Sequence, residues 1–424
     1  METPTCHIEA MLTDILVRLP LRSIARFKKV CKTWKTTIES PYFRRLFVSS
    51  HQNSSSSWSL LLCGTKEIIG FHGCETWDLP KSPSYFIPPS LKHSSFGYFS
   101  YAASSSGLVL INDSSYSDES YCYVGNPVLK QWIRIPPAPS YSIVLGLVTR
   151  VDEDGVVSSF KVIRLASVQS MNNDLACIWR VFIYSSEIGI WSFKEIYCPH
   201  QIRNMYYITL NGTAYFGWVS VYGVLVAHDF YSESNEFRVV KLPDYQSDKK
   251  GLRRFLTMSG GFIMYVTAFY QTEDDVLKIW RLNDDDESWK LLWVIKLPSI
   301  SVYVPMAMHP FDIGTVYLCS HHDRHLVSCN LRTLNYTILK DGYQDCFIDQ
   351  SVCESFVNGV SDPRSSSYLW NGVSVKFLPL VLPRWIGSVP CPPQAEMIDT
   401  VSLLSYMTST DRTMKRKNRN DNDF

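Results

Sequence analysis

Apolar residues recur at helical spacing near the start of the chain. Over residues 8–19 they fall three to four positions apart, so one face of an α-helix is apolar. Pro20 ends this helix, because the residue before a proline is displaced from the helical backbone region. A second apolar stripe covers residues 21–38, with lysines and arginines between its apolar positions, and Ser40-Pro41 ends it. The pattern predicts a small helical unit.

Beyond a polar, Ser-rich run at residues 49–57 the pattern changes to that of β-strands. Short apolar runs rich in Val, Ile, Tyr and Trp alternate with Gly, Pro, Asn, Asp and Ser, which predicts an all-β body over residues 58–395. The Ser-rich run has the composition of a flexible linker.

Within the body an aromatic-rich strand that ends in an aliphatic residue recurs at intervals of about 50 residues. The aliphatic ends of these strands are Leu79, Ile135, Ile196, Leu242, Leu297 and Leu339. Each interval can hold about four short strands, the size of one blade of a kelch-type β-propeller. We therefore expect a multi-domain α plus all-β protein, with helices followed by a β-propeller-like domain. A β-sandwich or two stacked β-domains are the alternatives.

Composition and charge narrow the class of protein. The 424 residues carry a net charge of +1, so neither nucleic acid nor an anionic membrane is an expected partner. No apolar run approaches the roughly 20 residues of a spanning helix, and no signal peptide is visible. Twelve cysteines lie scattered without a Cys-x-x-Cys pair, and we expect reduced core thiols.

The predicted helical unit has more apolar positions than two or three short helices can cover. Units of about 40 residues are rarely stable without a metal, a disulfide or a partner. Two solutions are equally open: a second protein accepts the apolar surface, or the helices pack onto the β body. The Ser-rich linker argues against permanent docking on the body.

The stretch Asp14–Trp34 closely resembles an F-box of the plant type. It holds Arg-Leu-Pro, then Arg-Phe, then Val-Cys-Lys-x-Trp at the expected spacings. The resemblance implies that residues 21–38 form two short helices broken near Val30, rather than the single helix that periodicity alone suggests. The family usually opens with Leu-Pro where this chain has His7-Ile8, which favours weaker binding of the family's adaptor.

The body resembles the F-box-associated, kelch-like domain of the same plant family. The matching segments, in the family's order, are Ser105–Leu108, Asn126-Pro127 with Trp132, Tyr184–Trp191 and Leu210–Phe216. Each motif is weak alone, but their order is a strong signal over residues 7–395. Asn211-Gly212 also predicts a tight hairpin turn on physical grounds.

The resemblance implies the substrate-recognition subunit of a Skp–cullin–F-box (SCF) ubiquitin ligase. In that family the helices bind a Skp-type adaptor, which connects to a cullin and a RING subunit, and the β domain captures a target protein. In such a ligase the transfer of ubiquitin is accelerated because the target is held near the conjugating enzyme. The chain itself then needs no catalytic residue, cofactor or metal. The adaptor-binding positions implied are Leu12, Ile15, Leu16, Leu19, Pro20, Leu21, Ile24, Val30, Cys31 and Trp34. Phe27 is expected in the core instead.

The expected organisation follows from both lines of reasoning. It comprises a helical domain at 5–48, a linker at 49–57, the target-binding β domain at 58–395, and a basic polar tail at 409–424. A cytoplasmic or nuclear location is expected. Lys415–Arg419 is either a nuclear import patch or a solvated end.

Other clusters offer weaker chemistry. The segment Cys319–Cys329 has metal-like composition, but its flanks read as strands around a hairpin turn. The acidic runs 273–275 and 283–287 are expected as solvated loop tips. The rival functions are an enzyme on a kelch-like propeller, which needs a bound metal or converging carboxylates, and an interaction module with a degenerate F-box.

Overall fold

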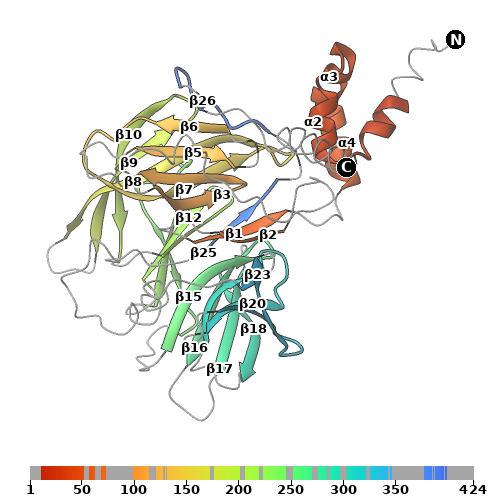
Figure 1. Cartoon of the computed structure of the whole chain (residues 1–424). Helices are drawn as coiled ribbons and strands as arrows, with labels where there is room; N and C mark the ends of the chain where they lie inside the picture. Colours follow the sequence, from red (N-terminus) through yellow and green to blue (C-terminus); the bar gives the residue numbers. More distant parts are fainter. Residues whose placement is uncertain are drawn as a thin grey trace, which may run out of the picture.

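The computed structural model consists of a group of short helices beside a ring of β-sheets (Figure 1). The residues that the structure describes are 11–51, 57–62, 68–72, 99–113, 121–127, 129, 131–171, 176–200, 206–218, 223–244, 252–269, 276–283, 287–296, 303–320, 325–341, 344–345, 377–383, 385, 387–395 and 397–398.

The helical part contains four helical segments in the described chain. Residues 11–16 are helical, and α2 (Leu21–Phe27), α3 (Lys32–Glu39) and α4 (Pro41–Ser50) follow. The break that was predicted near Val30 is confirmed, since α2 ends before it and α3 begins after it.

The Ser40-Pro41 step, which was expected to end the helical pattern, also begins α4. The Ser40 hydroxyl accepts a hydrogen bond from the Phe43 amide at 3.1 Å, and Pro41 occupies the first turn. Helix α4 continues through Ser50, so it includes the first two residues of the predicted linker.

The β part is built of antiparallel sheets that follow one another along the chain. The first two full sheets are β3 (Phe99–Ser105), β4 (Leu108–Asp113), β5 (Cys122–Asn126), β6 (Gln131–Ile135) with β26 (Met397–Ile398); and β7 (Ile143–Val151), β8 (Val157–Ser170), β9 (Cys177–Ser185), β10 (Ile190–Cys198). The third and fourth are β11 (Tyr206–Leu210), β12 (Thr213–Trp218), β13 (Val224–Asp229), β14 (Arg238–Lys241); and β15 (Leu252–Ser259), β16 (Phe262–Phe269), β17 (Val276–Leu282), β18 (Trp289–Lys296). The fifth is β19 (Tyr303–Met308), β20 (Thr315–Ser320), β21 (Leu326–Asn330) and β22 (Tyr336–Ile338).

Smaller sheets complete the described strands. A three-stranded sheet contains β25 (Phe377–Val381), β1 (Trp58–Leu62) and β2 (Ile68–His72), and β23 (Lys340–Asp341) pairs with β24 (Gln344–Asp345). The first strands of successive sheets contact one another, from β25 to β3, β7, β11, β15 and β19. A core cluster of Trp58, Tyr317 and Phe377 joins the fifth sheet to the three-stranded one, which closes the ring. The β-propeller that the sequence predicts is confirmed.

The closing sheet joins the two ends of the β domain. Strand β25 pairs antiparallel with β1, from Trp58 opposite Val381 to Leu62 opposite Phe377. The radial arrangement of separate blades leaves only short edges, instead of the long edges of one open sheet.

The recurrent aromatic strands of the sequence are the fourth strands, in chain order, of the five full sheets. They are β6, β10, β14, β18 and β22, while the segment that ends at Leu79 lies outside the described residues. Two tryptophans in these strands bond to the preceding sheet: the indole N–H of Trp191 donates to the Pro136 carbonyl, and that of Trp289 to the Lys241 carbonyl, both at 2.9 Å. The predicted spacing is therefore the blade period.

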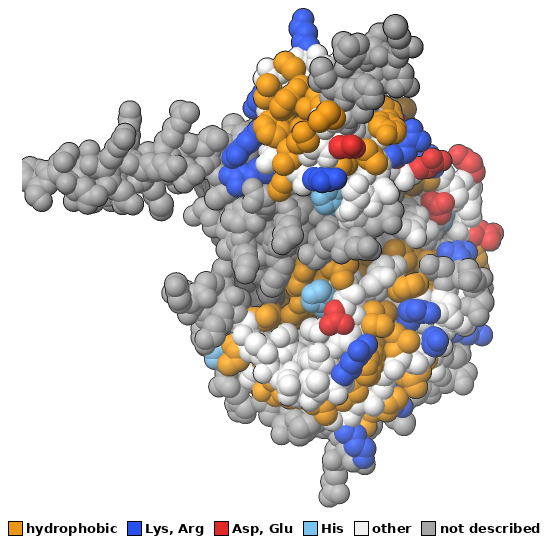
Figure 2. Space-filling model, turned by 90° about the vertical axis from the view of Figure 1, so that its right-hand side faces the viewer, with side chains coloured by type: hydrophobic (Ala, Val, Ile, Leu, Met, Phe, Trp, Pro, Cys, Tyr) orange, Lys and Arg blue, Asp and Glu red, His pale blue; other side chains and the backbone are white. Residues whose placement is uncertain are grey.

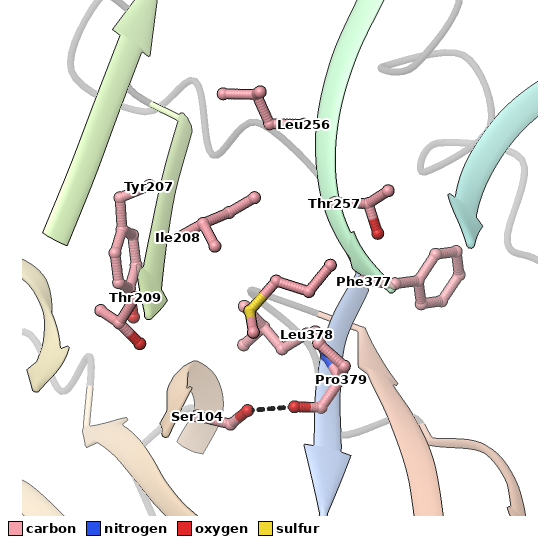
Figure 3. Close-up of a pocket in the computed structure, with 10 residues that line it drawn as sticks. Ser104, Tyr207, Ile208, Thr209, Leu256, Thr257, Phe377, Leu378 and Pro379 are labelled. Carbon is pink, nitrogen blue, oxygen red and sulfur yellow. Dashed lines mark hydrogen bonds between the residues drawn. The ribbon is translucent and has the colours of Figure 1, made fainter. Parts of the chain in front are cut away.

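A small cavity lies in the middle of the ring (Figure 3). It has a volume of about 30 Å³ and is lined by residues of β3, β11, β15 and β25. Across it the Ser104 hydroxyl donates a hydrogen bond to the Pro379 carbonyl at 2.5 Å. The cavity has room for one or two water molecules.

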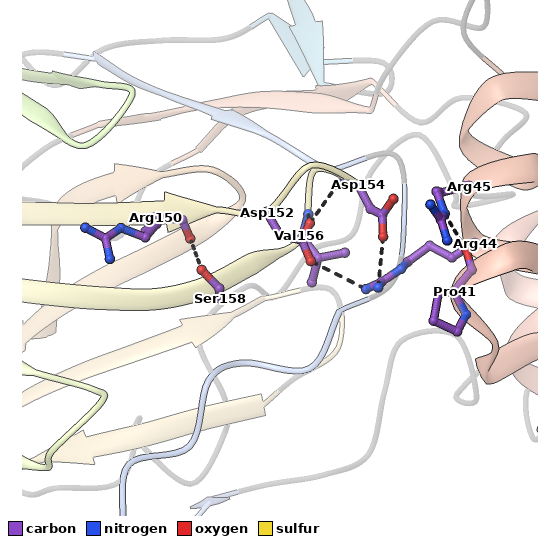
Figure 4. Close-up of polar contacts among 8 residues, drawn as sticks. All are labelled: Pro41, Arg44, Arg45, Arg150, Asp152, Asp154, Val156 and Ser158. Carbon is purple, nitrogen blue, oxygen red and sulfur yellow. Dashed lines mark hydrogen bonds and ion pairs between the residues drawn. The ribbon is translucent and has the colours of Figure 1, made fainter.

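The helices dock on the propeller, which corrects the expectation drawn from the linker. Phe43 and Phe47 of α4 are fully buried, and their rings meet Trp385 edge-on at 5.9 and 5.2 Å between centroids. Arg44 lies beside them and pairs with Asp154 at 2.9 Å and Asp152 at 3.6 Å, in the turn between β7 and β8 (Figure 4). A polar linker sequence does not prevent docking, because the contact is made by the helix before it.

Candidate functional site

The helices retain apolar side chains that the propeller does not cover. Met11, Ile15 and Val30 are 65%, 60% and 60% exposed, although large aliphatic side chains are usually buried. Leu12 and Trp34 are half-buried, and they pack against the core shared by the helices and the propeller. We call these five residues the helical patch. Figure 2 shows hydrophobic side chains gathered over the helices, with Lys and Arg beside them.

The predicted adaptor-binding residues divide into three groups by exposure. Ile15, Val30 and Cys31 are exposed. Those that are half-buried are Leu12, Leu19, Pro20 and Trp34. Those that are fully buried are Leu16, Leu21 and Ile24.

The three buried residues are part of the core that holds the helices together. Leu16, Leu21 and Ile24 are at most 1% exposed and belong to one cluster with Phe43 and Phe47. In the isolated chain these side chains do not reach the surface. Their effect on a partner is through the shape of the helical unit.

Phe27, which was expected in the core, is partly buried. Its ring packs edge-on against Trp34, with 5.1 Å between centroids. This contact holds the tryptophan at the corner between α2 and α3, which favours a preorganised surface there.

Two exposed residues of the helices, Met11 and Tyr42, are not among the predicted adaptor-binding positions. Met11 lies four positions before Ile15, and this helical spacing could have identified it. Tyr42 is 67% exposed in the first turn of α4, next to the buried Phe43.

The charged side chains around the patch are mostly basic. Lys28 forms an ion pair with Glu39 at 3.9 Å. Burial lowers the pKa of Lys28 below its ordinary value; Glu39 opposes this shift and the nearby Lys35 adds to it. Lys32 and Lys35 are exposed on α3, on either side of Trp34 in the sequence.

Cys319 and Cys329, the two thiols of the metal-like cluster, lie on opposite faces of the fifth sheet. Both thiols are buried, and they belong to two different core clusters on either side of the blade. The strands predicted on either side of the turn are confirmed as β20 and β21, while the histidines of residues 321–322 lie outside the described chain. Among the residues with described positions, no three His, Cys, Asp or Glu side chains lie close enough together to hold a metal.

Several other sequence features can be located. The predicted Asn211-Gly212 turn is confirmed between β11 and β12, with φ of 49° and 82°, the left-handed backbone of a two-residue hairpin. His7-Ile8, the tail at 409–424 and most of the two acidic runs lie outside the described residues. No described helix is both long and apolar enough to span a bilayer.

Comparison with known proteins finds similarity over nearly the whole chain. Residues 9–46 match the F-box domain, and residues 56–391 match the family "F-box protein At3g26010-like, beta-propeller". Among Arabidopsis thaliana proteins, the chain is 53% identical to "F-box protein At3g26010", with 97% of each chain covered. It is 44% identical to "Putative F-box/kelch-repeat protein At4g22430", with 96% of this chain and 98% of that protein covered.

Proposed function

Because the chain belongs to the family of F-box proteins with a β-propeller like that of At3g26010, we propose that it is the substrate-recognition subunit of an SCF-type ubiquitin ligase. The helices bind a Skp-type adaptor, and through it a cullin and a RING subunit. The propeller captures a target protein. The chain holds the target close to the ubiquitin-transferring subunits and requires no catalytic residue of its own.

The observation that carries this proposal is the helical patch. Met11 and Ile15, on the first helical segment, and Val30, in the turn between α2 and α3, are more than half exposed, while other apolar residues of the helical part are buried. Exposed apolar clusters of this kind mark protein-binding surfaces, because burial against a partner removes apolar area from water. A partner of helical structure can place its own apolar side chains against them.

The docked helices also support the proposal. Proximity accelerates a transfer only when the bound target lies within reach of the reacting group. Contacts of Phe47 with Trp385 and of Arg44 with Asp154 fix the helices on the propeller. The adaptor and the target are thus held at one distance and orientation, which favours modification of a limited region of the target.

The test is capture of a purified Skp-type adaptor by the full chain. In the test variant, Ile15→Asp with Val30→Asp places two charges in the helical patch, and both positions are exposed, so the fold is retained. The matched control is Ile190→Asp with Val294→Asp, which are 59% and 56% exposed on the outer strands of the propeller.

We expect the wild type and the control to capture the adaptor. Loss of interface anchors commonly costs about 2 kcal/mol or more, so the test variant should bind at least about thirtyfold more weakly. Failure of the folded wild type to bind would refute the proposal. Equal binding by the test variant would show that the helical patch is not the adaptor site.

A further inference from the structure

The positive charge of the chain is concentrated in the helices. Residues 11–51 contain nine Lys and Arg but only two Asp and Glu, a net charge of +7. The whole chain has a net charge of only +1, so the remaining residues sum to −6. The near-neutral total conceals this asymmetry between the two parts.

Most of these cations are exposed to solvent. The exposed ones are Arg18, Arg26, Lys29, Lys32, Lys35 and Arg45. Two basic residues of the helices pair with described acidic residues: Lys28 with Glu39, and Arg44 with the β7–β8 turn. We call Arg18, Arg26, Lys29, Lys32 and Lys35 the basic rim.

The basic rim adjoins the helical patch along the chain. Lys29 precedes Val30, and Lys32 and Lys35 lie on either side of Trp34. An interface with an apolar centre and a charged rim is the ordinary arrangement at protein surfaces. A partner with a basic rim of its own would suffer like-charge repulsion there, and a neutral one would leave these charges unmatched.

The apolar component decides between a protein and a nucleic acid. A phosphate backbone would match the basic rim, but it offers no apolar surface for Met11, Ile15 and Val30. An acidic protein surface with an apolar centre matches both components.

We propose that the adaptor surface that covers the helical patch is acidic, and that its carboxylates face the basic rim and steer association. This inference rests on the proposed function. It adds that binding is fast at low salt, that salt slows association, and that the location of the charge matters more than the total charge of the chain.

The experiment measures association and dissociation rates of the full chain with a purified Skp-type adaptor, at about 50 mM and about 500 mM NaCl. The test variant is Lys32→Glu with Lys35→Glu, which lowers the charge of the rim. The control is Lys290→Glu with Lys296→Glu, two exposed lysines of β18 on the propeller. Both variants have the same total charge, and their thermal unfolding is compared with that of the wild type.

For the wild type we expect the association rate to fall about tenfold or more between the two salt concentrations, with a smaller change in dissociation. At low salt the test variant should associate about tenfold more slowly than the control, and added salt should reduce the difference. A wild type that binds independently of salt, or equal slowing by both variants, would overturn the acidic partner while leaving the adaptor proposal intact.

Two other outcomes are separable. Absence of adaptor binding at either salt concentration would refute the proposed function and this inference together. Tighter binding of duplex DNA than of the adaptor, lost in the Lys32→Glu, Lys35→Glu variant, would show that the basic rim serves a nucleic acid and would overturn the acidic-protein assignment.

Discussion

Replacing Trp385 by alanine should release α4 from the propeller while leaving the sequence of the helix unchanged. Trp385 is 5% exposed, and its ring makes edge-on contacts with Phe43 and Phe47. Aromatic pairs of this geometry contribute about 0.5–1.5 kcal/mol each beyond the apolar area that they bury. Loss of both pairs alone weakens docking by about 1–3 kcal/mol, and the lost burial of the indole adds to this, so the undocked population rises at least about fivefold.

Hydrogen–deuterium exchange of the α4 amides measures this population. An undocked helix of 10 residues is barely stable in water, so its amides exchange whenever the contact opens. We expect exchange in α4 to accelerate by the factor given above, while exchange in β16, which lies in a distant blade, stays unchanged.

The control is Tyr42→Ala, which removes an exposed aromatic ring from the same helix. It should leave the exchange of α4 amides within about twofold of the wild type, since surface substitutions usually change stability by less than about 0.5 kcal/mol. Unchanged α4 exchange in the Trp385→Ala variant, or equal acceleration in both variants, would refute the docking argument.

Three further predictions concern the propeller. Burial lowers the pKa of His228, so the folded protein favours the neutral ring. The contribution of this ring to stability is therefore complete above the unfolded pKa of about 6.5 and is lost as the pH falls below it. In thermal unfolding from pH 8 to pH 5, the melting temperature of His228→Phe should fall less than that of the wild type. Trp191→Phe keeps the ring but loses the hydrogen bond to the preceding blade, which should lower the free energy of unfolding by about 1 kcal/mol in urea titrations. Gly107→Ala and Gly155→Ala both place a side chain at positive φ, which costs about 1–2 kcal/mol. The new Cβ at position 107 would also lie 2.6 Å from the Pro383 side chain, whereas nothing lies within 4 Å of the one at position 155. Gly107→Ala should therefore lower the free energy of unfolding more than Gly155→Ala.

Local sequence patterns predicted those parts of the fold that local interactions determine. The Asn211-Gly212 turn requires two residues with positive φ, and Asn followed by Gly is the pair that adopts this backbone most readily. The blade period was visible because a similar sequence recurs at the fourth strand of each full sheet, with tryptophans such as Trp191 that bond to the preceding blade. These features need no knowledge of distant partners.

The docking of the helices could not be predicted in this way. Phe47 and Trp385 are far apart in sequence, and periodicity does not specify which distant surface an apolar face meets. The same limit explains the burial of Leu16, Leu21 and Ile24. A single apolar stripe with a period of 3.6 residues serves both an internal core and a partner surface, and only the packed structure separates the two.

The closing sheet places a condition on the order of events during synthesis. The helices leave the ribosome first, but the ring that supports them closes only when β25 pairs with β1, and Trp385 follows β25. A growing or truncated chain therefore presents its helices without the support of the closed ring. Premature termination before Trp385 therefore removes the aromatic contact of α4 and leaves the propeller incomplete, so that only the contacts with earlier blades, such as the pair of Arg44 with Asp154, can still hold the helices.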